Sequence, residues 1–231
     1  MCGITGIITS EGLNPSIVSK FEKATIELSH RGPDFSKTIA DSHVMLGHTR
    51  LSIIDLDMRS NQPMSDHSKR FSIVFNGEIY NFQDLKKDSE SHGVVFHTTS
   101  DTEVLLSQYI LHGQKCLQKL NGCFAFAIYD RESKSIFIAR DRMGIKPLVY
   151  YVDEKTVAFA SEMKSLLELG FERKLDKVSA FTFFKLNYIP APHTILENHF
   201  KLKPGHCALI NISENKVNIE LEEYYTIPYD S

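Results

Sequence analysis

The chain has 231 residues, of which 42% are hydrophobic and 24% charged, and its formal net charge is −3. This composition is that of an ordinary globular protein, and its weak negative charge gives no basic surface for nucleic acid. No apolar run reaches the roughly 18–20 residues of a membrane-spanning helix, and the first residues lack the pattern of a secretory signal. We therefore expect a cytoplasmic protein that binds neither nucleic acid nor membrane.

The first half of the chain alternates between strand and helix patterns. Asn14-Pro15 is typical of a helix start, because asparagine caps the helix and proline fits its first turn. Ser100 and Glu103 form an S-x-x-E pattern, which predicts a capping box before the apolar residues that follow. The expected elements are a buried strand at 3–9, a helix at 15–28, strands at 44–46 and 71–75, a polar helix at 81–92, and a helix from 101 to about 113.

The second half consists mainly of strand patterns joined by short turns. Because tight hairpins dominate and helices come in groups, we expect antiparallel sheets with helices packed outside them, which is an α+β fold. We expect one domain over 1–231, with a core at about 2–190 and an appendage of strands at about 191–231. The expected elements are strands at 124–129, 136–139, 148–152 and 157–160, helices at 162–169 and 176–186, and further strands between 199 and 219.

Cys2 is the most informative residue of the chain. If Met1 is removed, Cys2 carries a thiol and a free α-amine, and the amine has an ordinary pKa of roughly 7.7–8.0. The amine can then act as the general base for its own thiol, so that no distant histidine is required. Because small residues at position two generally permit removal of the initiator, we expect the mature chain to begin at Cys2. If Met1 is retained, the nitrogen is an amide and the site should be inactive.

The other cysteines are expected to be reduced thiols without a metal. They are Cys116, Cys123 and Cys207, and the sequence contains no C-x-x-C pair that would indicate zinc. Cys123 lies in an apolar strand pattern and is expected in the core. The histidines form no H-E-x-x-H or similar metal-binding pattern.

Several short strings, taken together and in order, are far more specific than any one of them. They are Cys2-Gly3-Ile4-Thr5-Gly6-Ile7, Arg31-Gly32-Pro33-Asp34, the segment from His48 to Leu56, the segment from Phe75 to Asn81, and Thr99-Ser100-Asp101-Thr102-Glu103. The set resembles the class II glutamine amidotransferase domain, and within it the glutaminase half of asparagine synthetase. The resemblance runs nearly from end to end.

The resemblance implies a four-layer αββα sandwich of the N-terminal-nucleophile hydrolase type. It implies that Cys2 attacks the side-chain amide of L-glutamine, forms a thioester, and releases ammonia and then glutamate. Asn76 and Gly77 would form the oxyanion hole through a side-chain amide and a backbone N–H. Arg50 would bind the α-carboxylate of glutamine, and Asp101 its α-ammonium. The other residues implied to line the glutamine pocket are Leu51, Ser52, Ile53, Ile54 and Glu78, with Asn76 and Gly77 again.

Simpler interpretations exist for the binding residues. Asn-Gly is a frequent hairpin pair, so Asn76-Gly77 alone favours a β-turn. Arg50 alone is typical of a solvated surface charge, and Asp101 alone is typical of an acid at a helix start. These residues favour a glutamine site only because the other strings occur with them in the same sequence.

The remaining polar strings favour structural roles. His48 suggests a Cys–His dyad, but with an α-amine available a structural histidine is favoured. Arg31-Gly32-Pro33-Asp34 favours a rigid turn, with an ion pair between Arg31 and Asp34 near the pocket. The segment 140–147 contains three cations, yet it lacks the spaced glycines of a phosphate loop, so a structural loop is expected.

A complete asparagine synthetase carries a second, larger domain that binds ATP and Mg²⁺ and receives the ammonia. No Ser- and Gly-rich pyrophosphate loop is found in this sequence, so we expect no cofactor in this chain and a synthetase domain or subunit as partner. The acceptor of the ammonia is left open between aspartate and another carboxylate or sugar. A catalytically silent glutamine-sensing domain is the competing hypothesis, and a homodimer is compatible with the sequence.

Overall fold

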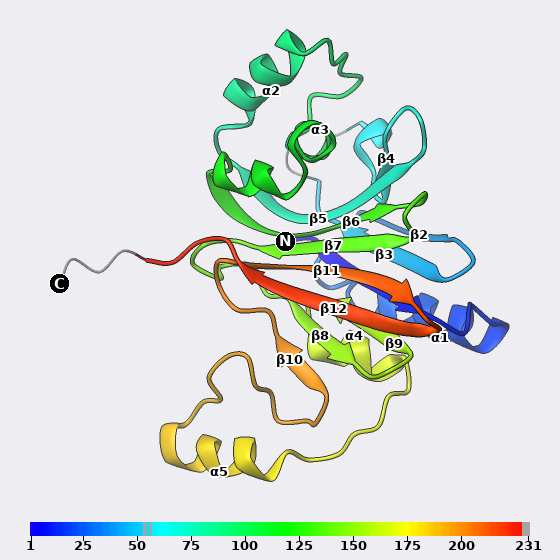
Figure 1. Ribbon diagram of the computed structural model, residues 1–231, viewed down its shortest axis with the longest axis vertical. Helices are drawn as coiled ribbons and strands as arrows, with labels where there is room; N and C mark the ends of the chain where they lie inside the picture. Colours follow the sequence, from blue (N-terminus) through cyan, green and yellow to red (C-terminus); the bar gives the residue numbers. More distant parts are fainter. Residues whose placement is uncertain (53–54, 56, 228–231) are drawn as a thin grey trace.

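The computed structural model describes residues 1–52, 55 and 57–227. Two six-stranded antiparallel sheets lie face to face, and helices cover their outer sides (Figure 1). No helix in the described part of the chain is long and apolar enough to cross a membrane.

The first sheet has the strand order β10-β8-β9-β1-β3-β2, and the second has the order β12-β11-β7-β6-β5-β4. The strands of the first sheet are β1 (Gly3–Thr9), β2 (Phe35–Ala40), β3 (Val44–Arg50), β8 (Val149–Val152), β9 (Thr156–Ala160) and β10 (His199–Lys201). Those of the second are β4 (Met64–Ser65), β5 (Phe71–Ile79), β6 (Gly122–Asp130), β7 (Ser135–Arg140), β11 (His206–Ser213) and β12 (Lys216–Glu223).

The helices are grouped by the sheet face that they cover. The elements are α1 (Pro15–Ile26), α2 (Phe82–Ser91), α3 (Asp101–His112), α4 (Met163–Glu168), α5 (Lys177–Leu186) and the 3₁₀ turns η1 (Met58–Ser60) and η2 (Gly113–Gln118). Helices α1 and α4 pack on the first sheet, whereas α2 and α3 pack on the second. The expected four-layer αββα sandwich is therefore confirmed.

Three apolar layers hold the sandwich together, and side-chain alternation along the strands decides which residue enters which layer. In β1, Ile4 and Ile8 are buried between the sheets, whereas Ile7 points to the other side and packs with Phe21 of α1. In β5, Val74 faces the inter-sheet core and Phe75 faces α3. The even-numbered residues of both strands thus face each other across the inter-sheet space.

The helix starts follow the local signals closely. The Asn14 side chain accepts the N–H of Ile17 at 3.0 Å, as the cap predicted. Ser100 accepts the N–H of Glu103 at 3.3 Å, which confirms half of the predicted capping box. The Glu103 carboxylate, however, accepts the N–H groups of His97 and Thr98, so it ties the preceding loop to α3 instead of closing the box.

Two expectations about burial need correction. The segment expected as an appendage supplies strands to both sheets, because β10 is an edge strand of the first sheet and β11 lies between β7 and β12 in the second. Ala208 and Ile210 of β11 are buried in the inter-sheet core. Cys123, expected in the core, is only partly buried and its Sγ lies 2.9 Å from the hydroxyl of Tyr80. Position 123 is near the start of β6, where the strand has not yet entered the layer beneath α3.

Candidate active site

A cavity of about 100 Å³ lies where β1, β3 and β5 meet the start of α3. Most of the residues that the resemblance singled out line it, namely Cys2, Arg50, Leu51, Asn76, Gly77, Glu78 and Asp101. Ser52 is not among the residues that line it, and Ile53 and Ile54 lie outside the described residues. Met1 also lines the cavity.

Cys2 is held in place through its backbone as well as its thiol. Its Sγ accepts the N–H of Leu51 at 3.5 Å, and its carbonyl accepts the Nε–H of Arg31 at 2.9 Å. Arg31 is in turn bound by Glu162, whose carboxylate lies 2.7 Å from Nη1. Burial raises the pKa of the Cys2 thiol and outweighs the lowering effect of the Leu51 N–H. An adjacent base is therefore needed to form the thiolate near neutral pH.

The expected ion pair between Arg31 and Asp34 is not formed. Arg31 points to Cys2 and Glu162, whereas the Asp34 carboxylate accepts the N–H of Ser52 at 2.7 Å. Both side chains thus leave their own turn and fix a segment next to the cavity. Arg31 positions the nucleophile, and Asp34 positions the start of the loop that follows Leu51.

Asn76 and Gly77 lie within β5, so the hairpin-turn interpretation was wrong. They are paired with Ala125 and Phe124 of β6. A Cβ on Gly77 would lie 2.3 Å from the carbonyl oxygen of Cys123. Glycine is therefore required by the close approach of β6, and its backbone is not in the left-handed region.

The free edge of β5 presents hydrogen-bond donors to the cavity. The N–H of Phe75 is taken by the side chain of Gln62 at 2.6 Å, and that of Ile79 by the carboxylate of Asp101 at 3.1 Å. Because alternate N–H groups of a strand point to the same side, the N–H of Gly77 points between these two partners, toward the cavity.

The side chain of Asn76 adds a second donor. It is 1% exposed, and its Nδ2 has no hydrogen-bond partner among the described residues. By strand alternation Asn76 is in phase with Val74 and faces the inter-sheet space, as Cys2 does from the opposite sheet in phase with Ile4. A buried amide without a partner costs about 1–3 kcal/mol. Such a group is expected where a ligand supplies the missing acceptor.

Asp101 brings an almost unpaired negative charge to the same cavity. It is the first residue of α3, but its carboxylate points to β5 and accepts the N–H of Ile79. Burial, together with the charge of Glu78, raises the pKa of Asp101 to about 6. A cation placed beside it would reverse that shift, so the site favours an ammonium group.

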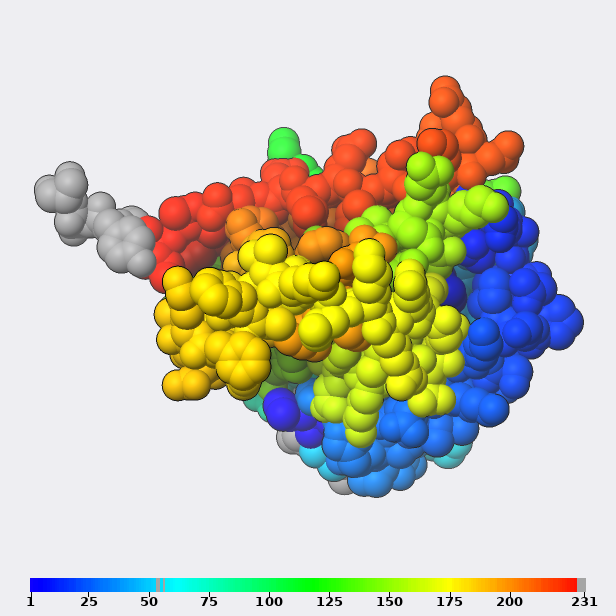
Figure 2. Space-filling model, turned by 90° about the horizontal axis from the view of Figure 1, so that it is seen from below, coloured from blue at the N-terminus to red at the C-terminus, as the bar shows by residue number. Residues whose placement is uncertain are grey.

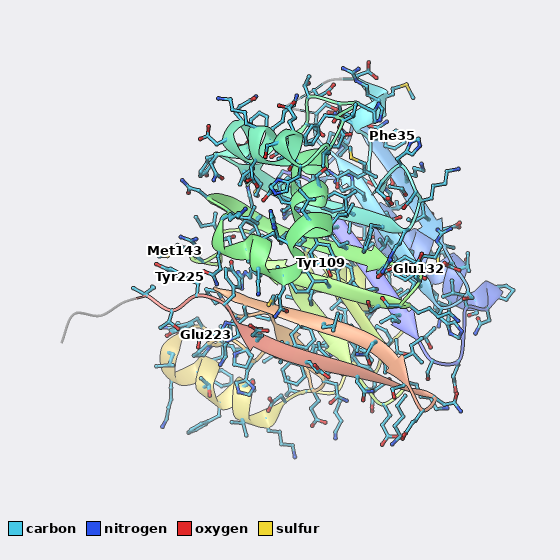
Figure 3. All side chains as sticks on the ribbon, turned by 45° about the horizontal axis from the view of Figure 1, so that its top comes forward. Phe35, Tyr109, Glu132, Met143, Glu223 and Tyr225 are labelled. Carbon is cyan, nitrogen blue, oxygen red and sulfur yellow. The ribbon has the colours of Figure 1, made fainter. Side chains whose placement is uncertain are left out.

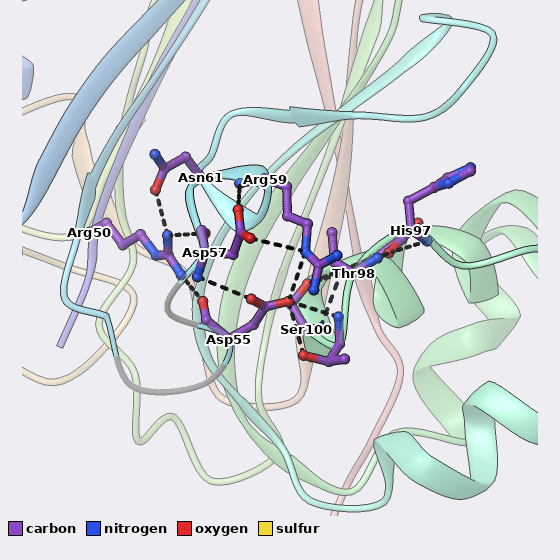
Figure 4. Close-up of polar contacts among 10 residues, drawn as sticks. Arg50, Asp55, Asp57, Arg59, Asn61, His97, Thr98 and Ser100 are labelled. Atoms are coloured by element: carbon purple, nitrogen blue, oxygen red, sulfur yellow. Dashed lines mark hydrogen bonds and ion pairs between the residues drawn. The ribbon is translucent and has the colours of Figure 1, made fainter.

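Arg50 is buried rather than a surface charge. Its guanidinium donates to the carbonyl oxygens of Asp55 and Asp57 and to the side chain of Asn61 (Figure 4). Asp55 is itself held by the N–H and hydroxyl of Thr99 at 2.8 and 2.9 Å. Burial opposes ionisation of Asp55, but the bonds from Thr99 outweigh it and lower the pKa of Asp55. Arg50 thus fastens one wall of the cavity to the loop before α3.

His48 has the structural role that the sequence favoured. It is fully buried, its Nε2 lies 3.2 Å from the carbonyl oxygen of Phe75, and burial lowers its pKa to about 3. A histidine with that pKa is neutral at physiological pH and is not among the residues that line the cavity. It therefore joins β3 to β5 across the inter-sheet space.

The sequence did not reveal that Ser60, Gln62 and Lys146 line the cavity. Gln62 accepts the N–H of Phe75 and donates to the hydroxyl of Thr102 at 3.2 Å, and no local pattern marks it. Lys146 lines the cavity from the segment 140–147, whose backbone is fixed as the structural-loop interpretation predicted. Among the described residues no group of three or more His, Cys, Asp or Glu is arranged to hold a metal ion.

Comparison with solved structures places the fold among the amidotransferases. The glutamine phosphoribosylpyrophosphate amidotransferase of Bacillus subtilis superposes with a TM-score of 0.70 over 98% of this chain and 50% of that protein, at 20% identity. At this identity the likeness shows the fold alone, and it agrees with the sandwich expected from the sequence.

Sequence comparison then gives the family. The model of the glutamine amidotransferase domain matches residues 1–225, so the chain belongs to the glutamine amidotransferase domain family. It is 36% identical to asparagine synthetase [glutamine-hydrolyzing] 3 of Bacillus subtilis, over 95% of this chain and 36% of that protein. It is 33% identical to amidase chry2 of Gibberella zeae, over 99% of this chain and 35% of that protein. The chain spans about a third of the length of these relatives.

Proposed function

We propose that the domain hydrolyses L-glutamine to glutamate and ammonia through a thioester on Cys2, and that the ammonia serves an ATP-dependent amidation of aspartate. The observation that carries the proposal is the Nδ2 of Asn76, which has no hydrogen-bond partner in the described part of the chain and lies in one cavity with Cys2 and Gly77. Two donors aimed at one cavity beside a thiol are the arrangement that stabilises an oxyanion.

The reaction begins when the α-amine of Cys2, freed by removal of Met1, takes the thiol proton. The thiolate attacks the side-chain amide carbon of glutamine, and the amide oxygen becomes an oxyanion bound by Asn76 and Gly77. The α-ammonium then gives its proton to the leaving nitrogen, so that ammonia departs and a γ-glutamyl thioester remains. Water, deprotonated by the same amine, attacks the thioester and releases glutamate with the thiol restored.

Charged groups at the cavity wall orient the substrate. The carboxylate of Asp101 binds the α-ammonium of glutamine, with the backbone of Glu78 beside it. Arg50 binds the α-carboxylate, for which its planar guanidinium is suited. Leu51 borders the amino-acid end of the substrate through its backbone. Ser52, Ile53 and Ile54 are proposed for the same role, although Ser52 is not among the lining residues and Ile53 and Ile54 lie outside the described residues. Binding of the ammonium requires the ionised form of Asp101.

The acceptor is proposed from the relatives. Aspartate is favoured because Bacillus subtilis asparagine synthetase 3 is named for asparagine formation from glutamine. Amidase chry2, at similar identity, supports a different acceptor as the second candidate. ATP and Mg²⁺ would act in a synthetase domain or subunit outside this chain. The four unpaired thiols favour a reducing compartment, which supports a cytoplasmic setting.

The experiment compares the wild type with Cys2→Ala in one preparation, by intact mass and by glutamine-dependent ammonia release. We expect Met1 to be absent, and ammonia and glutamate to form in equal amounts only in the wild type. Cys123→Ala is the matched control, because this thiol is partly buried and is not among the residues that line the cavity. A trimmed wild type that releases no ammonia and forms no adduct with a reactive glutamine analogue would favour a glutamine-sensing domain instead.

A further inference from the structure

A second cavity, of about 790 Å³, lies between the hairpin of β4 and β5 and helix α3. Its lining comes from the segments 59–69, 93–98 and 103–110. No described residue lines both this cavity and the one that contains Cys2. Binding sites for small molecules generally measure about 300–1,000 Å³. We call this space the hairpin cavity, and its volume fits a small molecule.

The hairpin cavity has an apolar lining that is only partly covered. Met64 and Leu106 are buried and belong to the core beneath α3. Val95 and Ile110, which line the same space, are 75 and 42% exposed. Because covering exposed apolar side chains is favourable, this lining suits the apolar part of a ligand.

The two acids of the hairpin cavity are already bound by the chain itself. The carboxylate of Asp66 accepts two N–H groups of its own hairpin, at 2.8 and 3.0 Å. The carboxylate of Glu103 accepts the N–H groups of His97 and Thr98, at 2.9 and 2.7 Å. A cationic ligand would therefore compete with backbone donors for these carboxylates.

The basic groups of the cavity are available by comparison. Lys69 lines the cavity and forms no ion pair with a described residue. His67 and His97 extend from opposite walls, and their rings stack with 6.4 Å between the centroids. Within the described part of the chain their ring nitrogens form no hydrogen bond. An ammonium has three donors and each imidazole at least one, so this set suits an anionic group.

A short series of contacts joins the hairpin cavity to the Cys2 cavity (Figure 4). Thr98 lines the hairpin cavity, and its hydroxyl lies 2.9 Å from that of Ser100, which lines the Cys2 cavity. Between them, Thr99 donates its N–H and hydroxyl to the carboxylate of Asp55. The carbonyl of Asp55 in turn accepts the guanidinium of Arg50.

Two further contacts reinforce this connection. Arg59 lines the hairpin cavity, and its Nε lies 3.8 Å from a carboxylate oxygen of Asp55. Ser100 is the N-cap of α3, whose first residue is Asp101. Asp101 and Arg50 both line the Cys2 cavity. A ligand that fixes residues 97–100 therefore acts on both of these charged groups.

The α3 wall of the hairpin cavity is firmly packed on the second sheet. Tyr109, labelled in Figure 3, stacks on Phe137 of β7 with 5.1 Å between the ring centroids. It meets the ring of Phe71 edge-on at 6.2 Å. The opposite wall is more exposed, as Val95 shows. A ligand held between the walls would therefore fix residues 93–98 relative to α3.

We propose that the hairpin cavity binds a small molecule with an apolar body and an anionic group, and that this binding raises the affinity of the Cys2 cavity for glutamine. The binding is independent of the proposed function, whereas the coupling rests on it. The sign follows from the contacts, because a ligand that fixes residues 93–98 favours the state in which Arg50 and Asp101 are in place. Glutamine then has less of the loop to order when it binds.

The probe is 4-phenylbutyrate, which combines an aromatic ring and a short alkyl chain with a carboxylate. Amide shifts of the labelled 231-residue chain are followed by NMR during titration. We expect saturable shifts in residues 65–69 and 93–98, with a Kd of about 1 mM or lower. The neutral 4-phenylbutyramide, and acetate without an apolar body, should bind at least about tenfold more weakly. Equal binding of the amide, or no saturable shift in these segments, would overturn the proposal.

Lys69→Asn tests the anionic end of the ligand. Lys69 has a φ of 60°, and asparagine tolerates this left-handed backbone. The variant should bind the probe about tenfold more weakly, because one charged donor is lost. The matched control is the exposed Lys177→Asn on α5. Figure 1 shows α3 and α5 on opposite sides of the two sheets, and α5 lies on the face seen in Figure 2. An equal effect of the control would overturn the assignment.

Val95→Ser tests the apolar end of the ligand. It should weaken binding of the probe at least about threefold, because a buried contact with an apolar side chain is lost. Val178→Ser on α5 is the matched control, since Val178 is 74% exposed and Val95 is 75% exposed. Unchanged binding by Val95→Ser would place the probe outside the hairpin cavity.

The coupling is measured with Cys2→Ala, which keeps glutamine intact. We expect 4-phenylbutyrate to raise the affinity for glutamine at least about fivefold, and glutamine to raise the affinity for the probe by the same factor. Equal glutamine affinity with and without the probe would overturn the coupling. If the variant binds no glutamine, the proposed function and the coupling both fail, while the probe titration still decides whether the hairpin cavity is a binding site.

Discussion

Two buried aspartates in this molecule have opposite surroundings. Asp141 is 1% exposed, and its carboxylate accepts the N–H groups of Phe124, Met143, Ile145 and Lys146 at 2.9–3.2 Å. Asp101 is 5% exposed, and its carboxylate accepts the N–H of Ile79 at 3.1 Å while it faces the cavity.

The difference separates a carboxylate that shapes the fold from one that awaits a ligand. Asp141 has its acceptor capacity filled by backbone, so it stabilises the segment 140–147 and has little left to offer a substrate. Asp101 keeps capacity unused and stands beside Glu78, at a cost in folding free energy. At this cavity, the unmet hydrogen-bonding capacity of Asn76 and Asp101 comes together beside Cys2.

Asp141→Ala should have the largest effect on the free energy of unfolding and tests the role of Asp141 in the fold. It leaves several buried N–H groups unpaired, each at about 1–3 kcal/mol, so we expect the free energy of unfolding to fall by about 3–5 kcal/mol. Urea unfolding measures this. Asp153→Ala is the control, because Asp153 accepts the N–H groups of Lys155 and Thr156 and the hydroxyl of Tyr151 in an exposed turn, and we expect a smaller loss of about 1 kcal/mol. Equal losses would refute the special role of Asp141.

Asn76→Ala tests the cavity, where the Nδ2 donor of Asn76 has no hydrogen-bond partner among the described residues. We expect kcat for ammonia release to fall by about 10²–10³, because one oxyanion donor is removed, with little change in KM. Stability should change little, because the Nδ2 has no partner among the described residues. Asn218→Ala, on the exposed edge strand β12, is the control and should leave kcat unchanged. An unaltered kcat in Asn76→Ala contradicts the assignment.

Asp101→Asn should raise the free energy of unfolding and lower kcat/KM. Because burial raises the pKa of Asp101 to about 6, the folded state binds its proton more tightly than the unfolded state, whose ordinary value is 3.8. The contribution of Asp101 to stability is therefore most favourable below about pH 4 and decreases as the pH rises to about 6. The variant should gain up to about 3 kcal/mol at pH 7 and lose about tenfold or more in kcat/KM.

Urea unfolding of Asp101→Asn and wild type at pH 4, 5, 6 and 7 provides the measurement. The stability difference should grow across this interval and then level off. A difference that stays constant with pH would show that the Asp101 charge is already compensated in the free domain.

Glu162→Gln should have the smallest effect. Burial opposes ionisation of Glu162, but hydrogen bonds from Arg31 and His30 outweigh it and lower the pKa of Glu162. Its contribution is therefore present above the ordinary value of 4.5 and is lost as the pH falls through the lowered one. We expect a loss of about 0.5–1 kcal/mol at pH 7, measured by urea unfolding, that disappears in acid.

Glu11→Gln is the matched control for Glu162→Gln. Glu11 forms an ion pair with Lys155 in which both side chains are 61% exposed, and its loss should produce no measurable change. If both substitutions are silent, Arg31 holds the carbonyl of Cys2 without help from Glu162.

Local sequence patterns predicted most elements of the fold, but not β2 or β4. Asn14 and Ser100 cap their helices because the cap depends only on residues within one turn. The paired strands 124–129 and 136–139 were found because a short turn joins them. The family strings predicted most of the residues that line the cavity, but Ser52 does not line it, and Ile53 and Ile54 remain predictions outside the described residues.

Distant partners explain the errors. Asn76-Gly77 has the local preference of a turn, but pairing with β6, which comes after two helices, keeps both residues in a strand. Arg31 has Asp34 nearby in sequence, yet its ion pair is made with Glu162, 131 positions away. Gln62 has no local signal at all, because its role depends on the unpaired edge of β5.

The central place of β1 in its sheet has a consequence for the order of folding. The strand that starts directly after Cys2 is hydrogen-bonded on one side to β3 and on the other to β9, where Thr5 pairs with Ala160. Contacts between such distant parts of a chain form late, since a long loop must first close. During synthesis the first strand must therefore wait for residues 156–160 to emerge. The nucleophile reaches its final position only when most of the domain has been made.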